Sequence, residues 1–212
     1  MENVSEIRNT EETPIEIDPW TDIWIRPRKT INWVINQNKG VLINLIFIYF
    51  GGVYYGITNA ESSSLGDSMS LRHILLVALL LSGLGGLISY NIFIWLISLS
   101  GTWLGGKGDF KNLQSAIAWT MIPAIAGLVL AIIGYIVFGM ELFQSDKSYL
   151  VILIRIYGII ESILIIWHIV LTIITISEVQ KFPISKAILS ILIAVLIIAI
   201  PAIFIGYLAR LF

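Results

Sequence analysis

Hydrophobic residues gather into five long runs along this chain, and short polar stretches separate them. The runs cover residues 41–57, 74–99, 116–138, 149–176 and 187–212. A helix needs about 20 residues to cross the hydrocarbon core of a bilayer, so these lengths suit membrane spans. The runs do not alternate as barrel strands do. Lipid offers no hydrogen-bond partner to the backbone, so each run must pair its own amides and carbonyls, as a helix does. We therefore expect an all-α bundle of five transmembrane helices over residues 40–212.

A different pattern precedes the first run. Residues 1–17 are acidic and poor in apolar groups, which predicts a disordered tail. In residues 18–39 apolar side chains recur at helical spacing, which predicts an amphipathic segment. Tryptophans and cations stand beside that apolar stripe: Trp20, Trp24, Arg26, Arg28, Lys29 and Trp33. Such side chains suit the headgroup layer, so we expect them to contact lipid; the alternative is a short helix packed on the protein.

The composition agrees with a membrane protein. Of the 212 residues, 57% are hydrophobic and 13% are charged, and there is no cysteine. Soluble domains carry about 25% charged residues. These figures exclude an ordinary globular enzyme, a disordered chain and a disulfide-rich scaffold. The net charge of -1 provides no field that would attract nucleic acid.

The distribution of Lys and Arg predicts the orientation, because cytosolic flanks carry the excess of these residues. Nine cations lie before the first run or in the second and fourth loops, and three lie in the flanks on the other side. The nine are Arg8, Arg26, Arg28, Lys29, Lys39, Lys107, Lys111, Lys181 and Lys186, and the three are Arg72, Lys147 and Arg210. We therefore expect a cytosolic N-terminus and an exterior or lumenal C-terminus.

Three short motifs resemble the Yip1 family. They are Asp18-Pro19-Trp20 leading into Ile25-Arg26-Pro27-Arg28, then Ala118-Trp119-Thr120-Met121-Ile122-Pro123, and the loop from Glu178 to Ala187. The resemblance implies five spans and a cytosolic N-terminus. Eukaryotic members act in vesicle traffic between the endoplasmic reticulum and the Golgi and bind Rab-type GTPases. This chain is more similar to the compact prokaryotic members, which implies a bacterial or archaeal cell membrane.

Three ionisable residues lie inside the fourth run: Arg155, Glu161 and His168. Ionisable groups are expensive in hydrocarbon and mark functional sites. Glu161 and His168 are seven residues apart, nearly on one helical face, so they could carry protons or hold a cation. The alternative is structural, with Glu161 hydrogen-bonded to Ser82, Ser89 or Asn91. Arg155, close to the exterior end, can extend its head to the interface.

Small residues predict where the helices pack closely. They are Gly52, Gly56, Gly83, Gly86, Gly127 and Gly134. Glycine allows close backbone approach, which is how helices associate in lipid. We expect these faces to pack within one bundle, and a homo-oligomer face is the alternative.

The sequence contains no nucleophile–base set with a supporting motif, no Walker loop and no clustered metal ligands. We therefore expect a non-enzymatic membrane protein without a metal or cofactor, whose partners are membrane lipids and other membrane proteins or further copies of itself. Its role would be membrane organisation or partner recruitment at a cytosolic face built from residues 20–39, 101–113 and 178–186. The alternative is a small proton- or ion-coupled transporter or channel that uses Glu161 and His168.

Overall fold

A computed structural model describes residues 17–37, 40–146 and 150–208. Residues 1–16 of the expected acidic tail lie outside these ranges, as do Arg8, Lys39, Lys147 and Arg210 from the orientation count. The described chain is helical, and five of its helical stretches are long and apolar enough to cross a membrane. Both the all-α fold and the number of spans are therefore confirmed.

Two short helices precede the spans, and the second and third spans each consist of two helices joined by a turn. The helices are α1 (Pro19–Ile25), α2 (Pro27–Gln37), α3 (Val41–Ser62), α4 (Leu71–Leu76), α5 (Gly83–Trp103), α6 (Phe110–Trp119), α7 (Ile122–Phe138), α8 (Val151–Gln180) and α9 (Ile184–Leu208). A π-helical turn, Val77–Ser82, joins α4 to α5, and 3-10 turns lie at Leu65–Asp67 and Gly139–Phe143. The second span is thus α4 with α5, and the third is α6 with α7.

The helices extend beyond several of the expected limits. The first hydrophobic run ends at residue 57, yet α3 continues for another turn to Ser62 and so carries Glu61 on its last turn. Backbone hydrogen bonding continues through polar residues once a helix has formed, whereas the hydrophobic pattern ends with the apolar residues. The hydrophobic pattern places Glu61 in the polar stretch after the first run, whereas the structure places its carboxyl group on a helix at the edge of the bundle.

A break divides the third span. Residues Thr120 and Met121 form a turn between α6 and α7, and Pro123 follows at the start of α7. Proline lacks the backbone N–H that would continue the helical ladder, which favours a break just before it. The carbonyl oxygen of Thr120 is consequently available to a side chain of another helix.

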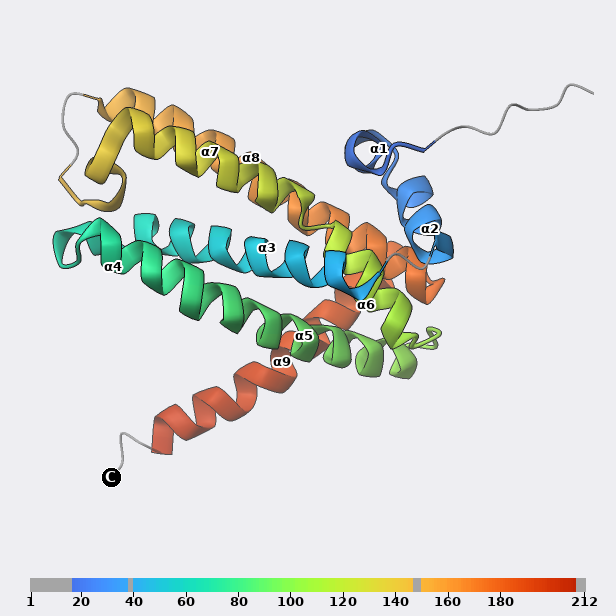
Figure 1. Ribbon diagram of the computed structural model, residues 1–212. Coiled ribbons are helices and arrows are strands. Elements are labelled where there is room, and N and C mark those ends of the chain that lie inside the picture. Colours follow the sequence, from blue (N-terminus) through green and yellow to red (C-terminus); the bar gives the residue numbers. More distant parts are fainter. Residues whose placement is uncertain (1–16, 38–39, 147–149, 209–212) are drawn as a thin grey trace, which may run out of the picture.

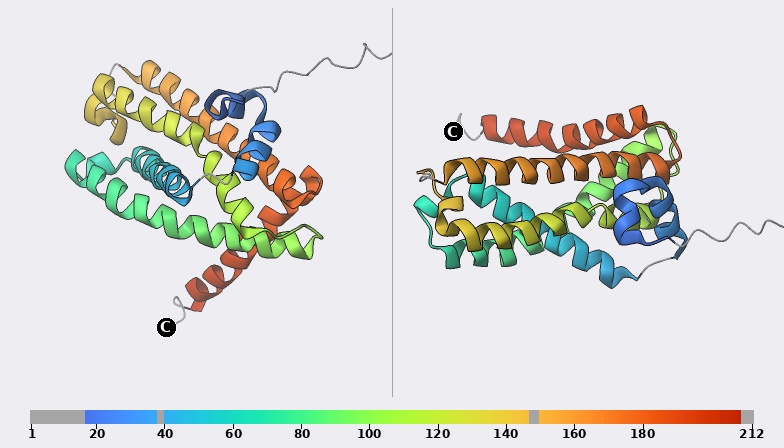
Figure 2. Two further views of the ribbon diagram at one scale, coloured as in Figure 1. Left: turned by 45° about the vertical axis from the view of Figure 1, so that its right-hand side comes forward. Right: turned by 90° about the horizontal axis from the view of Figure 1, so that it is seen from above.

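The bundle is arranged around α3, which packs against both α5 and α7. Helix α8 pairs with α7, and α9 lies against α5 and α8 near its beginning while its far end stands away from the other helices (Figure 1). Helices α1 and α2 gather at the end of the bundle where α3 and α9 begin (Figure 2). We call this the α2 end, and the other the α4 end.

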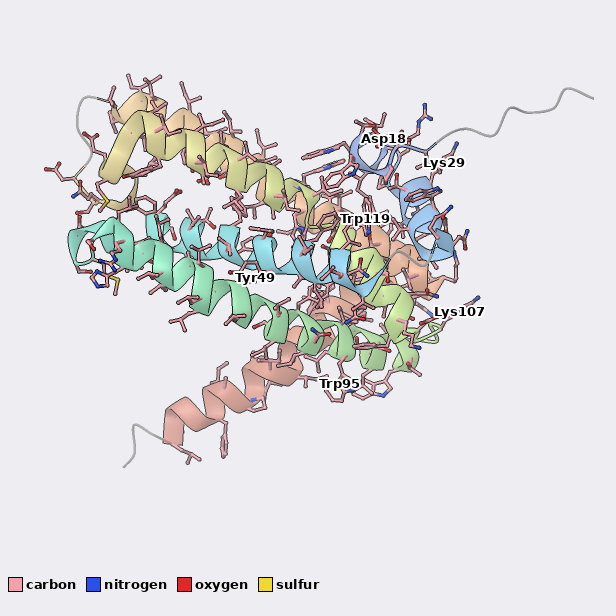
Figure 3. All side chains as sticks on the ribbon, viewed as in Figure 1. Asp18, Lys29, Tyr49, Trp95, Lys107 and Trp119 are labelled. Carbon is pink, nitrogen blue, oxygen red and sulfur yellow. The ribbon has the colours of Figure 1, made fainter. Side chains whose placement is uncertain are left out.

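Trp119 of α6 belongs to the larger of two core clusters of buried residues and lies at the α2 end. Its indole is almost wholly buried and contacts the rings of Trp20, Trp33 and Phe47 at centroid distances of 5.9, 6.4 and 5.2 Å. Figure 3 shows Trp119 at the junction of the bundle with the two N-terminal helices. Offset and edge-to-face ring pairs of this kind stabilise a core beyond their buried area. The aromatic cluster therefore fixes α1 and α2 on the bundle.

Candidate functional site

The N-terminal segment packs its apolar stripe against the protein. Ile23 of α1 and Ile31 and Val34 of α2 are fully buried in the main core cluster. Asp18 caps α1, because its side chain accepts a hydrogen bond from the Trp20 amide. The apolar stripe therefore packs on the protein, which is the alternative that the sequence left open.

The side chains expected at the lipid interface lie around that packed stripe. Arg26, Arg28 and Lys29 are exposed, and Trp24 and Trp33 are half-buried. Trp20 remains 48% exposed while its ring contacts Phe47 and Trp119. Figure 3 shows Lys29 at the outer side of the α2 end. Their contact with lipid stays a prediction.

An ion-pair cluster ties α2 to the end of α8. A carboxylate oxygen of Glu178 lies 3.1 Å from an Arg28 guanidinium nitrogen, and the other lies 2.9 Å from Lys181 Nζ. The Asn32 side-chain amide also donates to Glu178, at 2.9 Å. Glu178 is only 14% exposed, so water screens these contacts less than it would on an open surface. The carboxylate therefore joins two segments that are about 150 residues apart in the sequence.

Gln180 ties the α5–α6 connection to the same place. Its side-chain oxygen accepts a hydrogen bond from the Gly108 amide at 2.7 Å, and its side-chain nitrogen donates to the Ile97 carbonyl. Lys186 donates to the Leu104 carbonyl at 2.7 Å. Gln180 is nearly fully buried, so these bonds replace contacts with water. The three segments expected at the cytosolic face therefore meet at the α2 end.

A polar pocket of about 600 Å³ lies among these segments. It is lined by Asn32, Ile35, Asn36, Lys107, Asp109, Asn112, Val179 and Lys181. Figure 3 shows Lys107 at the outer edge of this end of the molecule. Amides and charges of both signs can bind polar backbone and side-chain groups, and Ile35 and Val179 add apolar surface to the lining. We call it the end pocket.

Glu161 lies in a second polar cluster, in the half of the bundle nearer the α4 end. The Tyr157 hydroxyl lies 2.9 Å from a Glu161 oxygen and 3.2 Å from a Glu61 oxygen, close enough to donate to either. The Glu61 carboxyl group is itself within hydrogen-bonding reach of Glu161. Within the described chain these contacts, rather than Ser82, Ser89 or Asn91, surround Glu161. The partners that the structural alternative named are therefore wrong.

A pocket of about 300 Å³ opens beside this cluster. It is lined by Thr58, Glu61, Ser62, Leu142, Ile154, Tyr157, Gly158, Glu161, Ser162 and Ile165. Two carboxyl groups, a phenol and three aliphatic hydroxyl groups thus share a small cavity with apolar side chains. We call it the carboxylate pocket.

His168 belongs to a separate site. Its Nδ1 donates to the Thr120 carbonyl at 2.7 Å, and its ring lies 5.8 Å from that of Tyr55. It borders a mostly apolar pocket of about 360 Å³ between α3, α5 and α8, which does not include Glu161. Although helical periodicity puts the two residues near one face of α8, the structure gives them different partners and different pockets.

Arg155 is exposed on α8, one turn from the beginning of the helix. It is six residues from Glu161, which places it on another face of the helix. The cluster around Glu161 therefore does not include this cation, and its extension toward the interface stays a prediction.

The six glycines singled out for packing all lie at close contacts. An added Cβ would come within 3.0 Å of a neighbouring atom at Gly52, Gly56, Gly83, Gly86, Gly127 and Gly134. Gly52 and Gly86 face each other's backbone, Gly127 accommodates the ring of Tyr54, and Gly134 that of Tyr157. These glycines serve contacts within one chain.

Sequence reasoning missed Glu61 and Tyr157. The signal that could have found Glu61 is its place four residues after the first run, within one helical turn of the expected span end. Among the described residues no three His, Cys, Asp or Glu side chains lie close enough together to hold a metal ion.

Comparison with known proteins gives a family. The model of the Yip1 domain matches residues 21–206, which covers the first four spans in full and the fifth as far as residue 206. No curated protein and no solved structure matches the chain. The matched residues include the motifs at the α6–α7 break and in the α8–α9 loop and the Ile25–Arg28 part of the first motif, whereas Asp18-Pro19-Trp20 lies before the match. The chain is a multi-pass integral membrane protein and belongs to the Yip1 domain family.

Proposed function

We propose that this protein recruits a cytosolic protein to its membrane through the end pocket and the polar surface around it. The Yip1 family is linked to membrane trafficking and is generally non-enzymatic, which agrees with a recruiting role. The observation that carries the proposal is the convergence of α2, the α5–α6 connection and the end of α8 on one polar pocket. Partly buried hydrogen bonds of Glu178 and Gln180 hold these segments in place. Such preorganisation lowers the entropic cost of binding.

The charges at the two ends support a cytosolic location for this surface. Within the described residues, seven Lys and Arg side chains belong to the α2 end and two to the other half of the bundle. The seven are Arg26, Arg28, Lys29, Lys107, Lys111, Lys181 and Lys186, and the two are Arg72 and Arg155. An excess of cations marks the cytosolic side of short-looped membrane proteins.

A photocrosslinking side chain at Asn36 tests the proposal in intact cells. We expect it to capture a defined cytosolic protein, because Asn36 lines the end pocket and is exposed. Adding Lys107→Glu should reduce that capture, since it reverses a charge in the same pocket. A crosslinker at Asp146, exposed at the α4 end, is the matched control and should not capture the same protein. Equal capture from both positions, or no effect of Lys107→Glu, contradicts recruitment through this surface.

A transporter that uses Glu161 and His168 together has less support. The two side chains line different pockets and bind different groups. A proton or ion pathway through both would need a connection between these pockets. We therefore keep recruitment as the proposed function.

A further inference from the structure

Two adjoining pockets form a groove along α3. The inner pocket, of about 360 Å³, is the one that His168 borders. The outer pocket, of about 480 Å³, continues toward the α4 end as far as Leu65 and Met69. The two pockets have four lining residues in common, namely Gly52, Tyr55, Gly86 and Ser89. We call the two together the α3 groove.

The α3 groove has about the length of one leaflet of a bilayer. Its lining on α3 extends from Ile48 to Ala60, which at about 1.5 Å per residue is roughly 18 Å. The hydrocarbon core of a bilayer is about 30 Å thick, so each leaflet contributes about 15 Å. Ala60 lies two residues before the end of α3 at Ser62, where the polar connection begins. The groove therefore extends from the membrane surface at the α4 end to about the middle of the membrane.

The polar side chains of the groove differ between its two parts. In the inner pocket, Tyr90, His168 and Thr172 each form a hydrogen bond with a backbone carbonyl of the protein. The outer pocket instead holds four polar side chains that form no hydrogen bond within the described chain, namely Tyr55, Asn59, Ser82 and Ser89. Three of the four are hydroxyl groups inside the spans, where a polar group without a partner is costly. The outer pocket is thus suited to hydrogen-bond acceptors and the inner pocket to an apolar group.

The walls of the groove give access from the lipid. Ser89 is exposed on α5 and Ile169 is 51% exposed on α8. Helix α9 contributes Ile191 to the lining, and its far end then stands away from the other helices (Figure 1). The second span is also irregular at the groove, because both ends of its π-helical turn, Val77 and Ser82, line the outer pocket. Such turns occur frequently at functional sites.

We propose that the α3 groove binds one glycerophospholipid from the leaflet at the α4 end. Hydroxyl groups and the Asn59 amide can donate hydrogen bonds to the ester and phosphate oxygens of the lipid. One acyl chain then lies in the inner pocket against Ile48, Phe93 and Ile117. Lipid tails surround the spans at this depth, so the gain over bulk lipid comes from close contacts and from the polar bonds rather than from removal of water.

Retention of phospholipid by the full chain tests the proposal. The protein is moved from nanodiscs of dioleoylphosphatidylglycerol into detergent, and the lipid bound per chain is counted by native mass spectrometry. We expect the parent to retain one lipid. Gly85→Leu should reduce retention at least about tenfold, because Gly85 lines the outer pocket and an added side chain meets no other atom within 4 Å of its Cβ. Gly206→Leu is the matched control on α9, with equally open space around it, and should retain the lipid as the parent does.

Photolabelling tests the orientation of the bound lipid. A phosphatidylglycerol that carries a diazirine at the end of one acyl chain should label the inner pocket, at Met121 or Ile169. The same lipid with the diazirine near its glycerol should label the outer pocket, at Asn59 or Met69. The reverse order, or equal labelling of the groove and of the exposed far half of α9, overturns the proposal.

Equal retention of lipid by Gly85→Leu and Gly206→Leu also overturns it. If Gly85→Leu fails to fold, Ser89→Leu at the junction of the two pockets replaces it and should lose the lipid in the same way. Crosslinks between two copies of the chain at groove residues would overturn the proposal in favour of a dimer interface. Failure here leaves recruitment through the end pocket untouched, because the end pocket and the α3 groove share no residue.

Discussion

Helices α3 and α5 meet at Gly52 and Gly86, and a single methyl group at Gly52 should separate them. A Cβ atom there would lie 2.6 Å from the Ser82 carbonyl oxygen and 3.1 Å from the Gly86 Cα atom. Contacting carbon atoms prefer about 3.5–4.0 Å. Because both obstacles are backbone atoms, no rotamer change relieves the clash and the helices must move apart. Overpacking of this kind costs about 1–3 kcal/mol, which we expect Gly52→Ala to subtract from the free energy of unfolding.

Reversible unfolding by SDS in mixed micelles measures this loss. Gly85→Ala is the matched control, since it adds the same methyl group to α5 with no other heavy atom within 4 Å. The control should differ from the parent by less than about 1 kcal/mol, the scale of the Gly–Ala difference in helix propensity. The double variant Gly52→Ala/Gly86→Ala should cost less than the sum of its singles, because one separation of the helices relieves both clashes. If Gly52→Ala and Gly85→Ala were equally stable, the close contact would not exist in the protein.

Three further predictions concern the α2 end and the topology. Glu178→Gln removes the ion pairs with Arg28 and Lys181 and should destabilise the protein by up to about 1 kcal/mol. Hydrogen exchange measured by mass spectrometry should then be faster for the α2 amides of the variant than for those of the parent. Unchanged exchange would mean that the aromatic cluster alone holds α2 on the bundle. Gln180→Ala leaves the half-buried Gly108 amide of the α5–α6 connection without its acceptor and should cost about 1–3 kcal/mol in the same SDS assay, against a negligible change for the exposed Asn36→Ala. Because the chain has no cysteine, single Asn36→Cys and Asp146→Cys variants should react with a membrane-impermeant maleimide from opposite sides, and labelling from one side would contradict five spans.

The five spans could be predicted because each is decided by its own residues. A run long enough to cross the bilayer and too apolar to remain in water has one favourable place, whatever its neighbours do. The close-packing glycines could also be singled out, since small residues at helical spacing leave a groove on any helix. The limits of the spans were less accurate, because α3 continues into polar residues and carries Glu61 with it.

The local hydrophobic pattern could not predict which distant segments contact each other. An amphipathic stripe such as that of α1 and α2 shows that one face is buried, but lipid and a protein core are both apolar and the stripe does not distinguish them. Similarly, Glu161 and His168 share a helical face, yet neighbouring helices give one a carboxyl partner and the other a backbone carbonyl.

Hydrophobicity and length thus set how many times this chain crosses the membrane, and charge placement predicts its direction. Which residues meet inside depends on how each helix is rotated and tilted against the others. Helices that are apolar on nearly every side, as α5 and α9 are, have little intrinsic preference for one rotation. Glycine contacts, the break before Pro123 and a few buried polar bonds choose among the rotations, and those same choices bring Glu61 to Glu161 and assemble the end pocket.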